Sequence, residues 1–585
     1  MRIKDTKNLE LLLETLKTEK KDLKNYFVPK LWRKVGDTYN NDISIMNVNP
    51  YDYFIEHIER ILEYKEKKVR TFHGLNEGII YNIFPRLTSA FDHDNDGIIG
   101  GNQKDISFNN DNIRETGTFL KCIALLGHIF DLKANIIHLL PITTIGKDGN
   151  KGTLGSPYAI KNPYKIDPNL NDTLISLDVE TQLKAFIEAC HLLGMKVIFE
   201  FVFITSSKDA DWTKENPQWY YWIDENIPAR KPGTTNINEL RNSYGPPYFT
   251  PDILKIIKEK VKKVDFMNLP APEENYKDFF KLPPPIEKVT IDSNGKIKGQ
   301  ATDSKTKNEV TCVIPGAFAD WPPDDVQPPW SDVTYLRMFV EPGKEIPQYN
   351  YIAYNTIRMY EGNLDKPENE NTSLWERIKG IIPYWRDEFK INGVMVDMGH
   401  AIPPRLMQDI VKTARNNNEE FIFLSENFAI EKKSVEEGYN AVVGYGWSVW
   451  TKENGLKSYI DHVVKQGVPI NYFGTGENHN TPRAAARSGH IAYSKLCWFL
   501  SSVIPMSIPF IHQGFELGEI YPVNTGLDFT PDEIKQYKTL ALFDIGHLNW
   551  QNKNNIIEFM KNLTDFRIEN YNVLSNQESG FFTYL

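Results

Sequence analysis

Two carboxyl groups, those of Asp397 and Glu426, stand where the sequence could bring a pair of reacting groups together. Asp397 follows the apolar run 394–396, and Glu426 comes shortly after the apolar run 421–424. Short apolar runs are typical of buried parallel strands, and the carboxyl ends of such strands form the active-site face of an α/β barrel. Carboxyl groups on adjacent strands can act as nucleophile and as acid/base in retaining glycoside chemistry. A strand-end cap or an ion pair explains either residue alone, whereas the combination predicts a catalytic pocket.

Two further strand ends carry polar groups. The first is that of Glu200, which lies in the apolar run 196–203. His400 follows Asp397 after a short turn. Tyr158 lies in the loop 155–163, GSPYAIKNP. The segment after the strand expected at 469–473 carries four consecutive candidates, which are Glu477, Asn478, His479 and Asn480. Acid, amide and imidazole groups at four strand ends favour one catalytic pocket over separate structural roles.

An acidic turn is the candidate metal site. Asp92, Asp94 and Asp96 alternate before Gly97, as in the first half of a Ca²⁺ loop, where alternate carboxylates converge and glycine permits the sharp turn. The later ligand positions hold Gly100 and Gln103, where an acidic ligand would help. A structural Ca²⁺ and a solvated acidic turn therefore both stay open, and no cofactor is required by the predicted chemistry.

The elements that must position these residues alternate between strand and helix. We expect strands at 78–84, 135–140, 196–203, 393–397, 421–425, 440–443, 469–473 and 503–511. Helical patterns fit 111–132, 374–390, 404–417, 431–438, 454–466, 484–501 and 553–570. Eight strands joined by helices predict an α/β fold of the (β/α)₈ TIM barrel type, built from right-handed βαβ units.

The chain divides into five predicted parts. Residues 1–75 form an N-terminal helical extension, in which Leu9, Leu12, Leu13 and Leu16 mark an amphipathic helix. Residues 76–205 carry barrel strands one to three, and 371–575 carry strands four to eight. Between them, 206–370 read as a large inserted subdomain, with a hairpin signal at Asn294-Gly295 and an aromatic run at 219–222. Residues 576–585 read as the start of a C-terminal β-domain that is truncated.

Composition excludes several classes of protein. The chain has 585 residues, of which 41% are hydrophobic, and a net charge of -10. This charge argues against nucleic acid or an anionic membrane as the main partner. Four widely spaced cysteines predict buried free thiols, and neither a signal peptide nor a run of about 18 apolar residues is visible. We therefore expect a cytoplasmic protein, with a homo-oligomer left open.

Beyond these patterns, the sequence resembles the α-amylase superfamily, which is glycoside hydrolase family 13-like. Asp397, Glu426 and the ENHN segment at 477–480 resemble the second, third and fourth signature regions of that superfamily. The details are most similar to its bacterial maltosyltransferase branch, which has histidine three residues after the nucleophile, as His400 is here. The other motifs that carry this likeness are VPKLW (28–32), GSPYAIKNP (155–163), VDMGHAIP (396–403), EEGYNAVVG (436–444), NTPRAAAR (480–487) and LGEIYPVNTGLD (517–528).

The resemblance implies a role for each candidate residue. Asp397 would be the nucleophile that forms a glycosyl-enzyme, and Glu426 would be the acid/base. Tyr158 would stack against the sugar next to the cleaved bond, and Asn480 would occupy the third catalytic position. The residues implied in substrate binding are Tyr158, Glu200, His400, His479, Asn478 and Glu477.

Three positions depart from the family pattern. Met395 stands where the family has arginine, Glu200 where it has aspartate, and Asn480 where it has the third catalytic aspartate. Loss of the arginine should raise the pKa of Asp397, because a cation favours the ionised carboxylate. Asn480 can bind ring hydroxyls but lacks the charge that stabilises an oxocarbenium-like state.

The predicted function is transfer of maltosyl or short maltooligosaccharyl units between α-1,4-glucans, with maltooligosaccharides or a starch- or glycogen-type glucan as partner. Three alternatives stay open at this point. The chain could be an α-amylase-type hydrolase, a catalytically impaired or inactive glucan-binding barrel, or a transferase with a phosphorylated maltosyl donor. The last would need a phosphate pocket, and the sequence has no Gly-rich phosphate loop.

Overall fold

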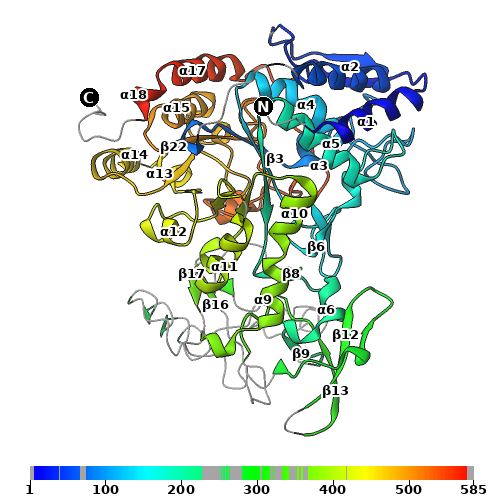
Figure 1. The fold of residues 1–585 in the computed structure, drawn as a ribbon, viewed down its shortest axis with the longest axis vertical. Coiled ribbons are helices and arrows are strands. Elements are labelled where there is room, and N and C mark those ends of the chain that lie inside the picture. The colour runs from blue at the N-terminus through cyan, green and yellow to red at the C-terminus, as the bar shows by residue number, and fades with distance from the viewer. Residues whose placement is uncertain are drawn as a thin grey trace.

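Eight parallel strands close into a barrel in the computed structural model of this protein (Figure 1). The structure describes residues 5–38, 40–65, 67, 74–226, 280–303, 306–316, 332–340, 366–416, 418–452 and 454–575, with isolated positions between 252 and 263 and short strands at 320–321, 352–354 and 357–359. The barrel strands, in the order in which they pair, are β3 (Ile80–Ile83), β4 (Ile136–Leu139), β7 (Lys196–Phe201), β18 (Gly393–Val396), β19 (Ile422–Ser425), β20 (Ala441–Val442), β21 (Asn471–Gly474) and β22 (Ser507–His512). The pairing of β22 with β3 closes the ring, so the predicted (β/α)₈ barrel is confirmed.

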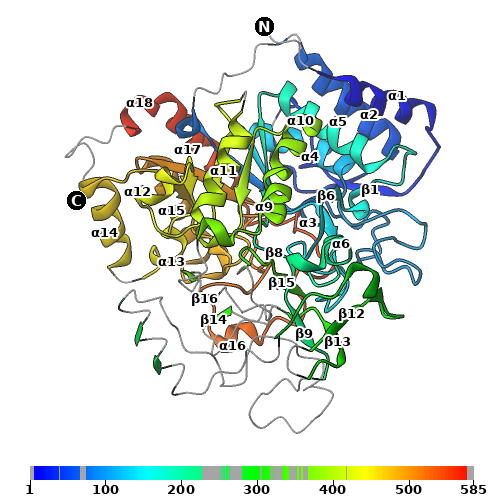
Figure 2. The ribbon, with the colours of Figure 1, turned by 60° about the horizontal axis from the view of Figure 1, so that its bottom comes forward.

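Helices surround this barrel (Figures 1 and 2). They include α4 (Phe119–Asp131), α5 (Val179–Leu192), α9 (Thr372–Lys379), α10 (Ile381–Phe389), α11 (Pro404–Arg415), α14 (Gly455–Ile460), α15 (His490–Val503) and α17 (Ile557–Glu569). The helix expected at 111–132 was predicted to begin too early, because Thr118 caps α4 by accepting a hydrogen bond from the N–H of Lys121. The helix expected at 484–501 begins only at His490, because Gly489 adopts a left-handed conformation with φ 92°.

The N-terminal segment packs outside the barrel. It comprises α1 (Lys7–Thr18), the hairpin of β1 (Tyr26–Pro29) and β2 (Ile45–Val48), and α2 (Pro50–Leu62). Leu9, Leu12 and Leu16 are fully buried, as the amphipathic pattern predicts. The side chain of Asn8 and the N–H of Leu9 both donate to Glu188 on α5, so α1 is attached to the barrel wall.

The segment between β7 and α9 holds small sheets rather than barrel elements. Strands β9 (Trp222–Asp224), β10 (Phe280–Lys281), β11 (Val289–Ile291), β12 (Ile297–Thr302) and β13 (Glu309–Val313) form one five-stranded sheet. Gly295, with φ 80°, lies in the turn that joins β11 to β12, so the predicted hairpin is confirmed. The aromatic residues at 219–222 are all buried, so they contribute to the core of this region.

The remaining elements are short. They are α3 (Pro85–Thr88), β5 (Thr143–Ile145), β6 (Ile160–Ile166), β8 (Thr205–Ser207), α6 (Asp211–Glu215), β14 (Asp320–Trp321), β15 (Val333–Tyr335), β16 (Ile352–Tyr354), β17 (Ile357–Met359), α12 (Lys432–Glu436), α13 (Gly446–Val449), α16 (Pro531–Ile534) and α18 (Tyr571–Leu574). The β-domain predicted to begin at 576 lies outside the described residues. The predicted domain boundaries stay predictions.

A separate apolar cluster fills the barrel. Every barrel strand contributes to it, and its members on those strands are Ile80, Ile136, Ile198, Met395, Ile422, Leu424, Ala441, Phe473, Ile508 and Phe510. All four cysteines are buried free thiols, as predicted. Among the described helices, none has the length and apolar character needed to cross a bilayer.

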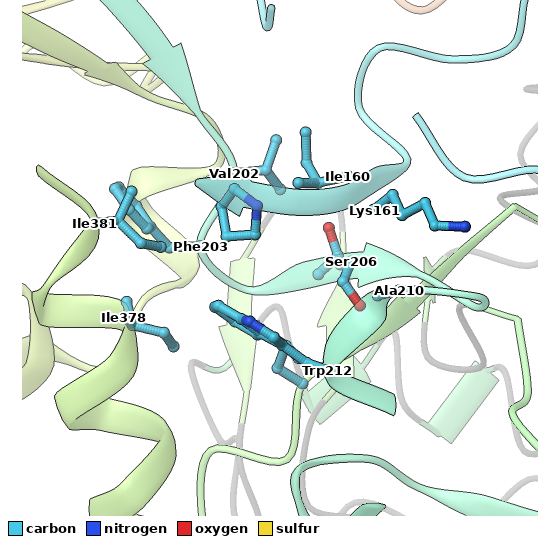
Figure 3. Close-up of a pocket in the computed structure, with 12 residues that line it drawn as sticks. Ile160, Lys161, Val202, Phe203, Ser206, Ala210, Trp212, Ile378 and Ile381 are labelled. Atoms are coloured by element: carbon cyan, nitrogen blue, oxygen red, sulfur yellow. The ribbon is translucent and has the colours of Figure 1, made fainter. Parts of the chain in front are cut away.

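A small pocket lies where the inserted segment meets the barrel (Figure 3), with a volume of about 290 Å³ including the part that opens to solvent. Ile378 and Ile381, from α9 and α10, lie on one side of it, and Ile160 of β6 and Trp212 of α6 contribute to the rest of its wall. Its lining is mostly apolar and shares no residue with the pocket described next.

Candidate active site

Strand periodicity directs the candidate carboxyl groups into the barrel mouth. Side chains alternate along a strand, so a residue two positions beyond an inward-facing one also faces inward. Ile198, Met395 and Leu424 belong to the barrel-filling cluster. Two positions further along the same strands lie Glu200, Asp397 and Glu426. The N–H of Asp397 donates to Phe201 O and that of Glu426 to Val396 O, so both residues extend the parallel ladder.

A pocket opens above these strand ends. Its volume is about 820 Å³, including the part that opens to solvent. Asp397 and Glu426 lie side by side in its wall with Tyr158 and Asn480. The other lining residues are Lys151, Ser156, Met398, Phe428, Asn524, Gly526, Leu527, Leu542 and Phe543. The size and the mixture of aromatic, apolar and polar groups suit a small organic ligand.

Asp397 and Glu426 interact directly. Burial, the charge of Glu426 and the charge of Glu200 raise the pKa of Asp397 well above its ordinary value, and Asp397 donates a hydrogen bond to Glu426. Burial and the charge of Glu200 also raise the pKa of Glu426 to about 7. Each carboxylate disfavours ionisation of the other, which favours a form of the pair that carries one proton.

The segment after Asp397 contacts Glu426 at two points. Met398 has φ 44°, a left-handed conformation that is uncommon for a residue with a side chain. Its N–H donates to Glu426 Oε2 at 3.0 Å. His400 Nδ1 lies 3.2 Å from the backbone oxygen of Glu426. Strained residues of this kind concentrate at functional sites.

Met395 occupies the position where the resemblance implies arginine. It pairs in register with Glu200 on β7 and with Leu424 on β19, and it is 4% exposed within the barrel-filling cluster. Its thioether side chain therefore brings no charge to Asp397 or Glu200. The raised pKa of Asp397 has the direction expected from this loss.

Tyr158, Glu200 and His479 form one contact group. The hydroxyl of Tyr158 donates to Glu200 Oε1 at 2.7 Å and lies 2.9 Å from His479 Nε2. The rings of Tyr158 and His479 are nearly parallel, with centroids 5.8 Å apart. Burial lowers the pKa of His479. Tyr158 is the member of this group that lines the pocket.

In the segment 477–480, one side chain lines the pocket and others make structural contacts. Asn480 lines the pocket, and its Oδ1 accepts a hydrogen bond from Asn524 Nδ2 at 2.9 Å. Asn478 Oδ1 accepts from the N–H of Asn480. Glu477 is 1% exposed and accepts hydrogen bonds from Arg483 Nη1 at 2.8 Å and from the N–H of Ala484. Its contacts are those of a buried ion pair, so a substrate contact by Glu477 stays a prediction.

Several pocket residues were not among the predicted site residues. Asn524, Leu527, Leu542 and Phe543 come from the long segment after β22. Arg86 holds this segment against the loop of Tyr158, because its guanidinium donates to the backbone oxygens of Gly155 and Leu542. Contacts of this kind between distant segments leave no local pattern.

Two other polar residues could have been found from strand periodicity. Asn82 and His138 stand two positions beyond Ile80 and Ile136 of the barrel-filling cluster, and they bind each other at 3.1 Å between Nδ2 and Nδ1. Both are at most 2% exposed.

The acidic turn at 92–97 is compact. Carboxylate oxygens of Asp92, Asp94 and Asp96 all lie within 4.8 Å of one another. Asp92 also accepts hydrogen bonds from the N–H groups of Asp96 and Gly97. Burial and the charge of Asp96 raise the pKa of Asp94. An all-oxygen donor set suits Ca²⁺, and a bound Ca²⁺ stays a prediction.

Curated relatives share part of the chain. No family model matches it. An alpha-1,4-glucan:maltose-1-phosphate maltosyltransferase of Burkholderia pseudomallei is 31% identical over 122 residues, which cover 19% of this chain and 10% of that protein. The maltosyltransferase of the same name from Mycobacterium tuberculosis is 29% identical over 150 residues, 24% of this chain and 19% of that protein. The chain thus spans less than a quarter of the length of either relative.

Solved structures resemble the chain over more of its length, at low identity. The maltogenic alpha-amylase AmyB from Thermotoga neapolitana is 18% identical with a TM-score of 0.46, covering 86% of this chain and 79% of that one. The Nostoc punctiforme debranching enzyme soaked with acarbose is 15% identical with a TM-score of 0.48, covering 86% and 83%. The likeness to maltosyltransferases is therefore found both in the motifs of this chain and in its curated relatives.

Proposed function

We propose that this protein is an α-glucan-active retaining enzyme that transfers maltosyl or short maltooligosaccharyl units between α-1,4-glucans. The observation that carries the proposal is the pair of carboxyl groups, Asp397 and Glu426, at adjacent strand ends in the wall of an open pocket. The curated relatives, which are named for maltosyl transfer to α-1,4-glucan, support the same class of substrate.

In the proposed reaction, Asp397 attacks the anomeric carbon while Glu426 protonates the departing glycosidic oxygen. Glu426 then takes a proton from the acceptor hydroxyl, which displaces Asp397 from the glycosyl-enzyme. The attacking form needs an ionised Asp397 and a protonated Glu426. The free pair already holds one shared proton, so the reactive form requires that proton to move from Asp397 to Glu426.

Entry of a sugar must break the hydrogen bond between the two carboxyl groups. Retaining glycosidases hold their carboxyl groups about 5 Å apart, with the anomeric centre between them. The N–H of Met398 fixes one oxygen of Glu426. We therefore assign the movement to the Asp397 side chain, which turns toward the anomeric carbon as the sugar arrives.

A second candidate function is glucan binding without turnover. Met395 leaves the nucleophile without its cation, and Asn480 supplies an amide where a carboxylate would stabilise positive charge. In the free protein, the shared proton rests on the residue that must attack. These observations favour a slow enzyme or a binding protein.

Product analysis separates the candidates. Maltoheptaose is incubated with the protein, with and without maltose 1-phosphate, and the products are resolved by chain length. Steps of two glucose units support maltosyl transfer, and dependence on maltose 1-phosphate identifies the phosphorylated donor. Glucose and short sugars without longer products would identify a hydrolase and overturn transfer.

The same experiment needs a binding control. Calorimetry with maltoheptaose reports binding whether or not turnover occurs. Binding without any product would support the non-catalytic candidate. A Met395→Arg, Asn480→Asp double variant that gains activity would then locate the defect at these two positions, whereas absence of both binding and product overturns the proposed function.

A further inference from the structure

A line of buried polar side chains crosses the barrel mouth beneath the pocket. Asn82 on β3 donates from Nδ2 to His138 Nδ1 on β4 at 3.1 Å. Because Nδ1 accepts this hydrogen bond, the ring proton of His138 lies on Nε2. That atom lies 3.0 Å from Glu200 Oε2 on β7. Three adjacent strands thus supply three consecutive members of one chain of contacts.

The other oxygen of Glu200 connects this line to the pocket. Glu200 Oε1 accepts the hydroxyl proton of Tyr158 at 2.7 Å. The same hydroxyl oxygen lies 2.9 Å from His479 Nε2. The position of the Tyr158 ring in the pocket wall therefore depends on where the Glu200 carboxylate is held.

Glu200 needs a partner because its surroundings are apolar on one side. It is 5% exposed, and its register partner on β18 is Met395, a member of the barrel-filling cluster. A buried carboxylate is costly unless a charge or a hydrogen-bond donor is paired with it. Burial acts to raise the pKa of Glu200, but its interactions with His138, His479 and Tyr158 together outweigh burial, and the pKa is lowered.

We propose that His138 is a positioning residue that acts through Glu200 on Tyr158. Strand β18 places the apolar Met395 beside Glu200, so the polar partner of Glu200 comes from His138 on β4. His138 holds Glu200 in place, and Glu200 in turn holds the sugar-stacking ring of Tyr158 beside Asp397. His138 is 2% exposed and acts without touching the ligand. The effect on ligand rests on the proposed function, whereas the effect on Tyr158 does not.

Three single variants, one double variant and one readout test this relay. His138→Phe keeps the ring volume and removes the donor, while His138→Gln keeps a donor amide. Calorimetry with maltoheptaose should show binding about tenfold weaker for His138→Phe, since the polar contact to one buried oxygen of Glu200 is lost. His138→Gln should stay within about threefold of the unchanged protein. Tyr158→Phe should bind as weakly as the double variant His138→Phe, Tyr158→Phe, because both changes break the same relay.

A matched control separates positioning from general destabilisation. His191 contacts Asn392 Oδ1 at 2.9 Å, beside the start of β18 and so at the opposite end of the barrel. His191→Phe should lower thermal stability without weakening binding. Unchanged binding in His138→Phe, or losses that add in the double variant, overturn the proposal.

If the unchanged protein binds no maltooligosaccharide, the proposed function fails and the relay is decided by crystallography. In a crystal structure of His138→Phe, the Tyr158 hydroxyl should leave its contact with Glu200 or His479. A Tyr158 side chain that keeps both contacts overturns the relay, independently of any ligand.

Discussion

Two groups of three carboxyl groups in this molecule illustrate opposite ways of keeping like charges close. Glu200, Asp397 and Glu426 come from three adjacent barrel strands, where Glu200 is buried and the other two line the pocket. Asp92, Asp94 and Asp96 come from one turn on the surface, where Asp96 is exposed and the other two are partly so.

In the barrel group, a shared proton and polar partners from other segments reduce the repulsion between the carboxyl groups. Asp397 and Glu426 share a proton, and Glu200 contacts His138 and Tyr158. In the turn, backbone N–H groups donate to Asp92, and Asp96 is exposed. The difference teaches that carboxyl clusters are distinguished by their surroundings, because carboxyl groups share a proton in one place and offer oxygen ligands to a cation in the other.

The largest expected effect is on glycosyl transfer. Asp397→Asn should lower the transfer rate by roughly 10⁴-fold, since no other group can form the glycosyl-enzyme. Asp94→Asn, the matched change in the surface turn, should leave the rate within about twofold. Initial rates with maltoheptaose measure both. Equal losses in the two variants would contradict the assignment of chemistry to the barrel group.

The pH dependence of transfer should reveal the shared proton. Below the pKa of about 7 at Glu426, both carboxyl groups of the pair are protonated and no nucleophile exists, so activity should rise as the pH passes 7. Met395→Arg should move this acid limb down by about one pH unit, because the new cation favours the ionised pair. Rates between pH 5 and 9 measure the shift, and an acid limb near pH 4 in the unchanged protein would contradict the raised pKa.

Stability should respond to the same proton. Folding raises the pKa of Glu426, so the folded state binds a proton that the unfolded chain releases, and stability falls as the pH rises from about 4.5 through 7. Glu426→Gln removes this penalty and should raise the unfolding midpoint by about 1–3 °C at pH 8. Thermal unfolding at pH 5 should show a smaller gain. The same gain at both pH values would mean that Glu426 is not the titrating group.

The smallest expected effect concerns the surface turn. If Asp92, Asp94 and Asp96 bind Ca²⁺, adding Ca²⁺ to EGTA-treated protein should raise the unfolding midpoint by ~1 °C, since a ligand that binds only the folded state stabilises it. Asp94→Asn should abolish the shift, and Mg²⁺ serves as the control cation. An unfolding midpoint that does not change when Ca²⁺ is added would support the other interpretation, a solvated acidic turn.

Much of the fold and part of the site followed from local patterns. The spacing of apolar runs predicted all eight barrel strands, and the residues at their ends included Asp397 and Glu426. The prediction erred where capping decides, since Thr118 and Gly489 start their helices later than apolar periodicity suggested. Such ends depend on single hydrogen bonds and dihedral angles, which periodicity does not report.

The sequence by itself determined which side chains face the barrel mouth, because strand alternation is a local property of the backbone. It also showed that Met395 stands where the resemblance implies a charged arginine. Only the tertiary structure decided what replaces that charge, since His138, Glu200 and Tyr158 meet through packing of segments far apart in the chain. The pocket wall after β22 was decided in the same way, by the contacts of Arg86 with two distant loops.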